Sequence, residues 1–175
     1  MDEELHGYVM EARRGNPDAF TELVRRFQGP VFRYAYGMLG DRQEAEDAAQ
    51  ETFIKAYRSL SGLGSDYAFA SWIMKIANHA CVDRLNRRKK ERQAVRDVPS
   101  ETADKTDRNA EWRTALTEAM ESLSAEHRQV VLLHDVQGYR YEEIADFLRI
   151  PLGTVKSRLN AARLALRNEW KKGEA

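Results

Sequence analysis

The fold of the C-terminal part of the chain is decided by the stretch Tyr141-Glu-Glu-Ile-Ala-Asp-Phe-Leu-Arg-Ile-Pro-Leu-Gly-Thr-Val-Lys-Ser-Arg-Leu159. Apolar side chains recur at helical spacing on both sides of the short segment Pro151–Gly153. We therefore expect two helices, over residues 141–148 and about 154–170, to pack across a tight turn as a helix-turn-helix. The alternative is an ordinary helical hairpin with a solvated basic face.

The second helix of this pair has polar and basic side chains opposite its apolar stripe. These side chains are Lys156, Ser157, Asn160, Arg163 and Arg167. Basic and amide groups on one exposed helix face reach phosphates and base edges in a DNA major groove. Together with the tight turn that opens on Gly153 and Thr154, this face favours DNA as the ligand.

The rest of the chain also has helical periodicity, and no segment shows the alternation of a β-strand. Asn16-Pro17 predicts a helix start, with asparagine as the cap and proline at the first helical position. Gly29-Pro30 predicts a break in that helix. Asp41 with Glu44 predicts the capped start of a further helix. The fold class expected is all-α.

Two small helical domains joined by a flexible linker explain the distribution of apolar residues. Residues 96–110 contain almost no large apolar side chain, so this segment cannot bury a core. We therefore predict a domain at residues 1–95, a linker at 96–110 and a second domain at 111–175.

The charge of the chain is balanced overall but unevenly distributed. It has 28 basic and 28 acidic residues in 175. Acidic residues dominate 41–51, whereas six basic residues lie within 84–92. Separated acidic and basic faces indicate two different partners. No apolar run is long enough to span a membrane and Cys81 is the single cysteine, so we expect a cytoplasmic protein without membrane insertion or a disulfide framework.

The acidic segment is predicted to form a helix with one face turned away from its apolar stripe. That face contains Glu46, Asp47, Gln50, Glu51 and Ile54. Acidic residues near a helix N-terminus have an ordinary explanation in the helix dipole. A branched apolar residue among them is typical of a protein contact.

The basic segment follows a loop at Ser61–Asp66 and a helix that begins near Phe69. Aromatic residues next to cations suit single-stranded nucleic acid, because bases stack on rings while phosphates pair with cations. The alternative is that the aromatic residues belong to the core and the cations complement a helix C-terminus. We expect Trp72 to be mostly core and the loop to make the base contacts.

An enzymatic function has little support in the sequence. The four histidines show no metal-ligand spacing, and no phosphate-binding glycine loop or nucleophile elbow is present. We therefore predict no catalytic residue, no metal, no cofactor and no small-molecule substrate.

Three segments together resemble the extracytoplasmic-function group of bacterial sigma-70 factors, over nearly the whole chain. Glu44-Ala-Glu-Asp-Ala-Ala-Gln-Glu-Thr-Phe53-Ile-Lys-Ala56 is similar to region 2.2 of that family. Phe69-Ala-Ser-Trp-Ile-Met-Lys-Ile-Ala77 with Asp83-Arg-Leu85 is similar to regions 2.3 and 2.4. Tyr141–Ala145 with Pro151–Leu159 is similar to region 4.2. Their order and spacing make the resemblance specific.

The resemblance implies a non-enzymatic subunit that directs core RNA polymerase to promoters. The face Glu46, Asp47, Gln50, Glu51 and Ile54 would dock on the β′ clamp helices, and the C-terminal domain on the β flap. Melted minus-ten DNA would contact Ser61, Gly62, Leu63, Gly64, Ser65, Asp66, Asn78, His79, Asp83, Arg84, Arg87 and Arg88. Duplex minus-thirty-five DNA would contact Thr154, Lys156, Ser157, Arg158, Asn160, Arg163 and Arg167. An anti-sigma factor would be the regulator.

Three other functions remain open at this point. A stand-alone helix-turn-helix regulator would bind duplex DNA tightly without polymerase and would have little use for the acidic helix. An adaptor would bind a protein through Asp41–Ile54 and merely tolerate DNA. A metal-dependent enzyme is the least supported.

Overall fold

The computed structural model of the chain describes residues 3–94 and 117–173. Within these ranges the chain is helical and contains no β-strand, which confirms the all-α prediction. Contacts between Cα atoms divide the chain into two compact units, Met1–Tyr36 with Asp41–Cys81 and Gly37–Gly40 with Val82–Ala175. The predicted linker at 96–110 lies outside the described residues, so the boundaries of the two predicted domains remain predictions.

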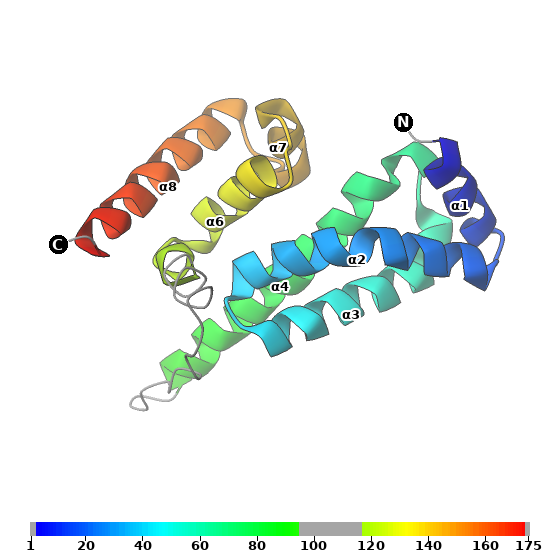
Figure 1. The fold of residues 1–175 in the computed structure, drawn as a ribbon, viewed down its shortest axis with the longest axis horizontal. Coiled ribbons are helices and arrows are strands. Elements are labelled where there is room, and N and C mark those ends of the chain that lie inside the picture. Colours follow the sequence, from blue (N-terminus) through cyan, green and yellow to red (C-terminus); the bar gives the residue numbers. More distant parts are fainter. Residues whose placement is uncertain (1–2, 95–116, 174–175) are drawn as a thin grey trace. The chain divides into compact units, whose positions relative to one another are not determined.

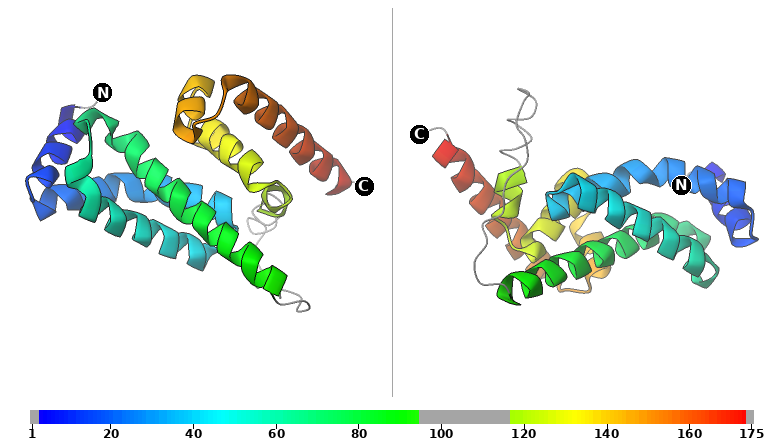
Figure 2. Two further views of the ribbon diagram at one scale, coloured as in Figure 1. Left: turned by 180° about the vertical axis from the view of Figure 1, so that it is seen from behind. Right: turned by 90° about the horizontal axis from the view of Figure 1, so that it is seen from below.

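The N-terminal helices form a small bundle. They are α1 (Glu3–Arg13), α2 (Pro17–Leu39), α3 (Arg42–Ser59) and α4 (Phe69–Ala94), with two 3₁₀ turns, η1 (Leu60–Gly62) and η2 (Asp66–Ala68), between α3 and α4. Figures 1 and 2 show α2, α3 and the first part of α4 side by side, with α1 at one end of the bundle. Val9, Leu23 and Ile73 from three of these helices are fully buried.

Helix α2 continues without interruption through Pro30, so the predicted break at Gly29-Pro30 is wrong. A proline in a helix interior removes a backbone hydrogen bond and costs ~3 kcal/mol. Leu23 lies before the proline and Val31 and Tyr34 lie after it, and all three are fully buried on one stripe. Burial of each such side chain contributes about 1.5–3 kcal/mol, which together outweighs the cost of the proline.

The predicted helix starts are confirmed by their capping hydrogen bonds. The side-chain oxygen of Asn16 accepts from the backbone N–H of Asp18 at 3.0 Å. The carboxylate of Asp41 accepts from the backbone N–H of Glu44 at 2.8 Å. Each bond satisfies one of the amide groups that the first turn of a helix leaves without a partner.

The C-terminal helices pack α6 (Ala125–Val131) and α7 (Tyr141–Leu148) against α8 (Leu152–Gly173). Helix α6 continues into a π-helical turn, η3 (Leu132–Val136), which leads to Gly138 with a positive φ of 76°. Helix α8 begins two residues before the predicted position 154. Ile144, Val155 and Leu159 are buried where the predicted apolar stripe lies, so the helix-turn-helix is formed as expected.

Candidate protein and nucleic-acid interfaces

The acidic face of α3 lies on the protein surface. Glu46, Asp47 and Gln50 are exposed, and the Ile54 side chain is 46% exposed although it is apolar. Glu51 pairs with Lys55, with a carboxylate oxygen 2.7 Å from Nζ. Arg42 pairs with Glu46 at 2.9 Å in the same i, i+4 arrangement. Exposed pairs of this kind hold the side chains loosely, because each contributes only ~0.3–0.5 kcal/mol.

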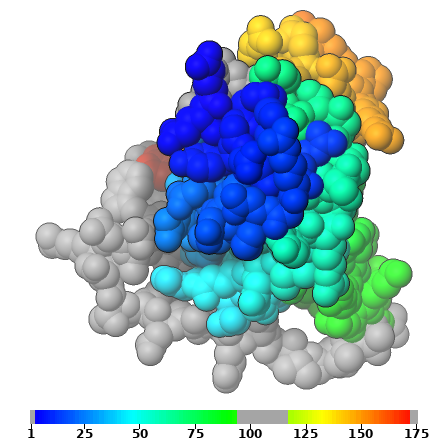
Figure 3. Space-filling view, turned by 90° about the vertical axis from the view of Figure 1, so that its right-hand side faces the viewer, coloured from blue at the N-terminus to red at the C-terminus, as the bar shows by residue number. Residues whose placement is uncertain are grey.

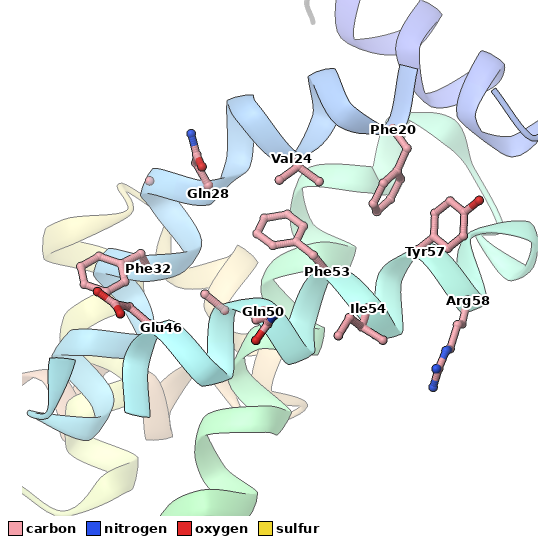
Figure 4. Close-up of a pocket in the computed structure, with 12 residues that line it drawn as sticks. Phe20, Val24, Gln28, Phe32, Glu46, Gln50, Phe53, Ile54, Tyr57 and Arg58 are labelled. Atoms are coloured by element: carbon pink, nitrogen blue, oxygen red, sulfur yellow. The ribbon is translucent and has the colours of Figure 1, made fainter. Parts of the chain in front are cut away.

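An open apolar groove of about 1100 Å³ borders this acidic face between α2 and α3. We call it the α2–α3 groove. Its lining residues are Phe20, Val24, Gln28, Gly29, Phe32, Glu46, Ala49, Gln50, Phe53, Ile54, Tyr57 and Arg58. Figure 4 shows Phe20 and Val24 pointing from α2 toward Phe53 on α3. The groove is therefore lined by aromatic side chains and by three residues of the acidic face, Glu46, Gln50 and Ile54.

The groove was not predicted from the sequence. Phe20, Phe53 and Tyr57 fit the apolar stripes of their helices, which favoured a core position for each. In the structure Tyr57 is 56% exposed, and its ring meets that of Phe20 edge-on with centroids 5.0 Å apart. The signal that could have shown the groove is Phe32, a large aromatic residue that lies off the buried stripe of α2.

The loop after α3 offers small polar groups to solvent. Ser61, Gly62, Gly64 and Ser65 are exposed, whereas Leu63 is buried and anchors the loop to the bundle. A side chain at Gly62 or Gly64 would meet no atom within 4 Å, so the backbone there faces open space. A large ligand can therefore approach the loop backbone closely at both positions.

The loop is also tied to α1, a connection that the sequence did not indicate. Arg13 Nη1 lies 2.5 Å from Asp66 Oδ1. Tyr67 stacks on His6, with ring centroids 4.4 Å apart and planes 5° from parallel. Asp66 is thus partly covered, in contrast to the exposed residues before it.

Helix α4 places the predicted contact residues at different depths. Asn78 is buried, and its side-chain oxygen accepts a 2.8 Å hydrogen bond from the Tyr34 hydroxyl. Asn78 therefore belongs to the bundle interior and not to a DNA-facing surface in this structure. His79 and Asp83, the next predicted positions, are exposed.

The basic segment of α4 contains both exposed and partly covered cations. Arg87, Lys89 and Lys90 are exposed, whereas Arg84 and Arg88 are partly covered. Arg88 donates to the carbonyl oxygen of Leu39 at 2.9 Å, at the C-terminal end of α2. A cation is favourable at that end because the last carbonyls of a helix lack partners and carry partial negative charge. Part of the basic cluster therefore has a structural role.

The helix-turn-helix depends on a left-handed residue in its turn. Arg149 has φ 55° and ψ 47°, the conformation that commonly ends a helix, and the Ile150 N–H bonds to the Ala145 carbonyl at 3.0 Å. At the other end of α7, the Arg140 N–H donates to the Glu143 carboxylate at 2.7 Å. This bond lowers the pKa of Glu143. These bonds define the two ends of α7.

Five of the seven predicted DNA-contacting residues of α8 are exposed. Lys156, Ser157, Asn160, Arg163 and Arg167 are exposed, and Thr154 and Arg158 are partly covered. Arg163 forms an ion pair within the chain: Arg163 Nη2 lies 2.5 Å from Asp135 Oδ1, and Arg163 Nε donates to Asp135 Oδ2 at 3.4 Å. The hydrogen bond to Asp135 raises the pKa of Arg163. This pair was not predicted from the sequence, because Asp135 and Arg163 are 28 positions apart.

Two properties of the described residues bear on other functions. Within 3–94 and 117–173, no group of three or more His, Cys, Asp or Glu residues has a geometry that can hold a metal ion. None of the helices in these ranges has the length and apolar character needed to cross a bilayer.

Comparison with known proteins shows the family of the chain. Residues 23–91 match the family model for Sigma-70 region 2, and residues 113–166 match that for Sigma-70, region 4. The RNA polymerase sigma-H factor of Pseudomonas aeruginosa is 33% identical over 90% of this chain and 89% of its own length. The ECF RNA polymerase sigma-E factor of Salmonella typhimurium LT2 is 32% identical over 97% of this chain and 96% of its own length.

Two solved structures share the fold. CnrH, in complex with the cytosolic domain of CnrY, matches 97% of this chain and 98% of its own with a TM-score of 0.74 and 20% identity. The sigma factor RpoE of Bartonella quintana, in complex with the anti-sigma factor NepR, matches 87% and 96% with a TM-score of 0.67 and 24% identity. The chain belongs to the extracytoplasmic-function group of the sigma-70 family, as the sequence resemblance implied.

Proposed function

We propose that this sigma factor binds core RNA polymerase through the acidic face of α3 together with the α2–α3 groove. The observation that carries the proposal is the position of Ile54 and Gln50, which belong to the acidic face and also line the groove. Charged rims around an apolar centre are typical of protein interfaces. The family resemblance assigns the partner as the β′ clamp helices, and the C-terminal domain would contact the β flap.

The proposed minus-ten contacts come from the loop after α3 and from α4. The exposed positions that support this proposal are Ser61, Gly62, Gly64, Ser65, His79, Asp83 and Arg87. Leu63 and Asn78 are buried, and Arg88 is held by its hydrogen bond to the Leu39 carbonyl. Arg84 and Asp66 are partly covered. Melted DNA suits these elements because the loop exposes its backbone and α4 exposes cations further along its length.

The proposed minus-thirty-five contacts lie on the exposed side of α8. Lys156, Ser157 and Asn160 follow the turn of the helix-turn-helix, where the first residues of a recognition helix meet base edges. Arg163 and Arg167 lie further along the helix, and Thr154 and Arg158 flank the exposed residues. The protein has no catalytic role of its own in this proposal.

An anti-sigma factor is the proposed regulator. The support comes from the two proteins of similar fold, one solved with the cytosolic domain of CnrY and the other with the anti-sigma factor NepR. The exposed apolar groove of this chain needs covering whenever polymerase is absent, which gives such a regulator a surface to occupy.

In-vitro transcription on fragmented genomic DNA tests the proposed function. Core polymerase with this protein should initiate at discrete start sites that core polymerase alone does not use, and sequencing the transcripts defines the promoters. The protein without core should bind duplex promoter DNA weakly. Tight duplex binding without polymerase, and no new start sites with it, would instead identify a stand-alone helix-turn-helix regulator.

A further inference from the structure

Tyr67 is an exposed aromatic side chain beside the loop after α3. It is 60% exposed, the largest value for a large apolar side chain in the described ranges 3–94 and 117–173. The two aromatic residues that follow it differ, since Phe69 is buried and Trp72 is partly covered. Of the three aromatic residues at the start of this segment, Tyr67 alone presents a largely open ring.

The ring of Tyr67 is held flat by α1. The His6 ring stacks on it, with ring centroids 4.4 Å apart and planes 5° from parallel. One face of the Tyr67 ring is therefore covered, and its exposed surface lies on the other face and the edges. His6 comes from a helix whose neighbouring residues Leu5 and Val9 are buried. Figure 3 shows the dark-blue atoms of α1 against the blue-green atoms of this region. The platform is therefore built from two elements and oriented before any ligand binds.

A second contact fixes the backbone next to the ring. The Arg13–Asp66 ion pair joins α1 to the residue before Tyr67, and the Ala68 N–H bonds to the Ser65 carbonyl at 2.9 Å across the same turn. The pair also neutralises a carboxylate that would otherwise repel phosphates approaching Gly64 and Ser65. Removal of this repulsion makes the surface compatible with the phosphates of a nucleic acid.

We propose that Tyr67 is a stacking platform for one unpaired base of melted promoter DNA, and that His6 and Arg13 are its positioning residues. The inference rests on the proposed function, because it assumes that the loop faces the minus-ten segment. An aromatic ring with one free face stacks any base, and such a contact is worth roughly 5- to 100-fold in affinity. The residue adds a contact to the proposed minus-ten surface that the exposed loop atoms do not supply.

The test combines a residue change with removal of the base. Holoenzyme is bound to a fork-junction DNA with a single-stranded minus-ten segment, taken from a promoter that the wild-type holoenzyme uses. A series of these DNAs has an abasic site at each single-stranded position in turn. Affinities are measured by fluorescence anisotropy for the wild type, Tyr67→Ala and Tyr67→Phe.

One abasic position should weaken wild-type binding by about 5- to 100-fold and have little further effect on Tyr67→Ala. Tyr67→Phe should behave as the wild type, because it keeps the ring. If the losses from Tyr67→Ala and from every abasic position simply add, the stacking proposal is overturned while the sigma function stands. A Tyr67→Ala defect in core binding instead of DNA binding would also overturn it, in favour of a protein contact. Failure of the wild type to initiate at any promoter overturns both proposals.

The positioning residues are tested in the same assay. Arg13→Gln and His6→Ala should each reduce the effect of that single abasic position, because a mobile ring stacks less well. Arg14→Gln is the matched control, since Arg14 directly follows α1 but pairs locally with Glu11 at 2.9 Å. An Arg13→Gln variant that keeps the full wild-type abasic effect would remove Arg13 from the proposal.

Discussion

Arg163 and Asp135 are joined by two hydrogen bonds between α8 and the π-helical turn η3, through Arg163 Nη2 and Nε. Arg163, a predicted minus-thirty-five contact, is thus already engaged in an ion pair within the chain. Both side chains are well exposed, at 44% and 39%. Pairs with this exposure are worth about 0.2–1 kcal/mol, so DNA phosphates can compete for the guanidinium.

Replacing the carboxylate should release Arg163 to DNA. We expect Asp135→Asn to strengthen binding of holoenzyme to promoter DNA at low salt, and to steepen the dependence of log K on log salt by about one phosphate contact. Asp146→Asn is the control, because it removes the same charge from an exposed position on α7. Equal effects of the two variants would mean that net charge, and not the pair, controls Arg163.

The recognition helix should distinguish sequence-specific from general contacts. Lys156→Ala should weaken binding to the cognate minus-thirty-five element by about 1–3 kcal/mol if Lys156 contacts a base. Lys171→Ala, at the far end of the same helix, should have a much smaller effect. Competition binding with cognate and scrambled elements measures the difference. An equal loss on both elements would reassign Lys156 to a phosphate.

The α2–α3 groove should supply apolar binding energy to the polymerase contact. Ile54→Asp should reduce the affinity for core polymerase by at least about 2 kcal/mol, the range of a central interface residue. The fold should survive, because the Ile54 side chain is already half exposed. Ile54→Leu, which keeps the apolar volume, is the control. Affinity is measured by titration of labelled protein with core enzyme, and an unchanged value for Ile54→Asp would exclude the groove.

Asn78 should prove structural. Asn78→Ala removes the acceptor of the buried Tyr34 hydrogen bond and should lower the free energy of unfolding by about 1–3 kcal/mol. His79→Ala, the exposed neighbour, should change it by less than about 0.5 kcal/mol. Urea unfolding followed by circular dichroism gives both values. If Asn78→Ala unfolds like the wild type, its side chain does not hold the bundle together.

Much of the fold could be predicted from the sequence because local signals agreed with burial. Asn16, Asp41 and the turn before α8 are short-range features, and each appears within a residue or two of its predicted place. Pro30 shows where local reasoning fails. Its cost is a local property, whereas the burial of Leu23 and Tyr34 on one stripe depends on the helices packed against α2.

The surfaces were less predictable for a related reason. The acidic face of α3 follows from periodicity within one helix. The α2–α3 groove, the Arg163–Asp135 pair and the stack of His6 on Tyr67 each join residues from different elements. Helical periodicity indicates which side chains of a helix face away from the core. It does not indicate which residues of other elements those side chains contact. Asn78 illustrates the converse, since a polar residue next to exposed His79 lies inside the bundle.

The central claim is that the acidic face of α3 binds the polymerase. The most direct measurement is the affinity for core enzyme of Asp47→Lys with Glu51→Lys, beside a control that reverses Glu3 and Glu11 on α1. Because these side chains are exposed or partly exposed, both variants should keep the helical circular dichroism of the wild type. The account predicts that the α3 reversal abolishes core binding and promoter-dependent initiation while the α1 reversal leaves both intact. Wild-type affinity in the α3 variant would contradict it.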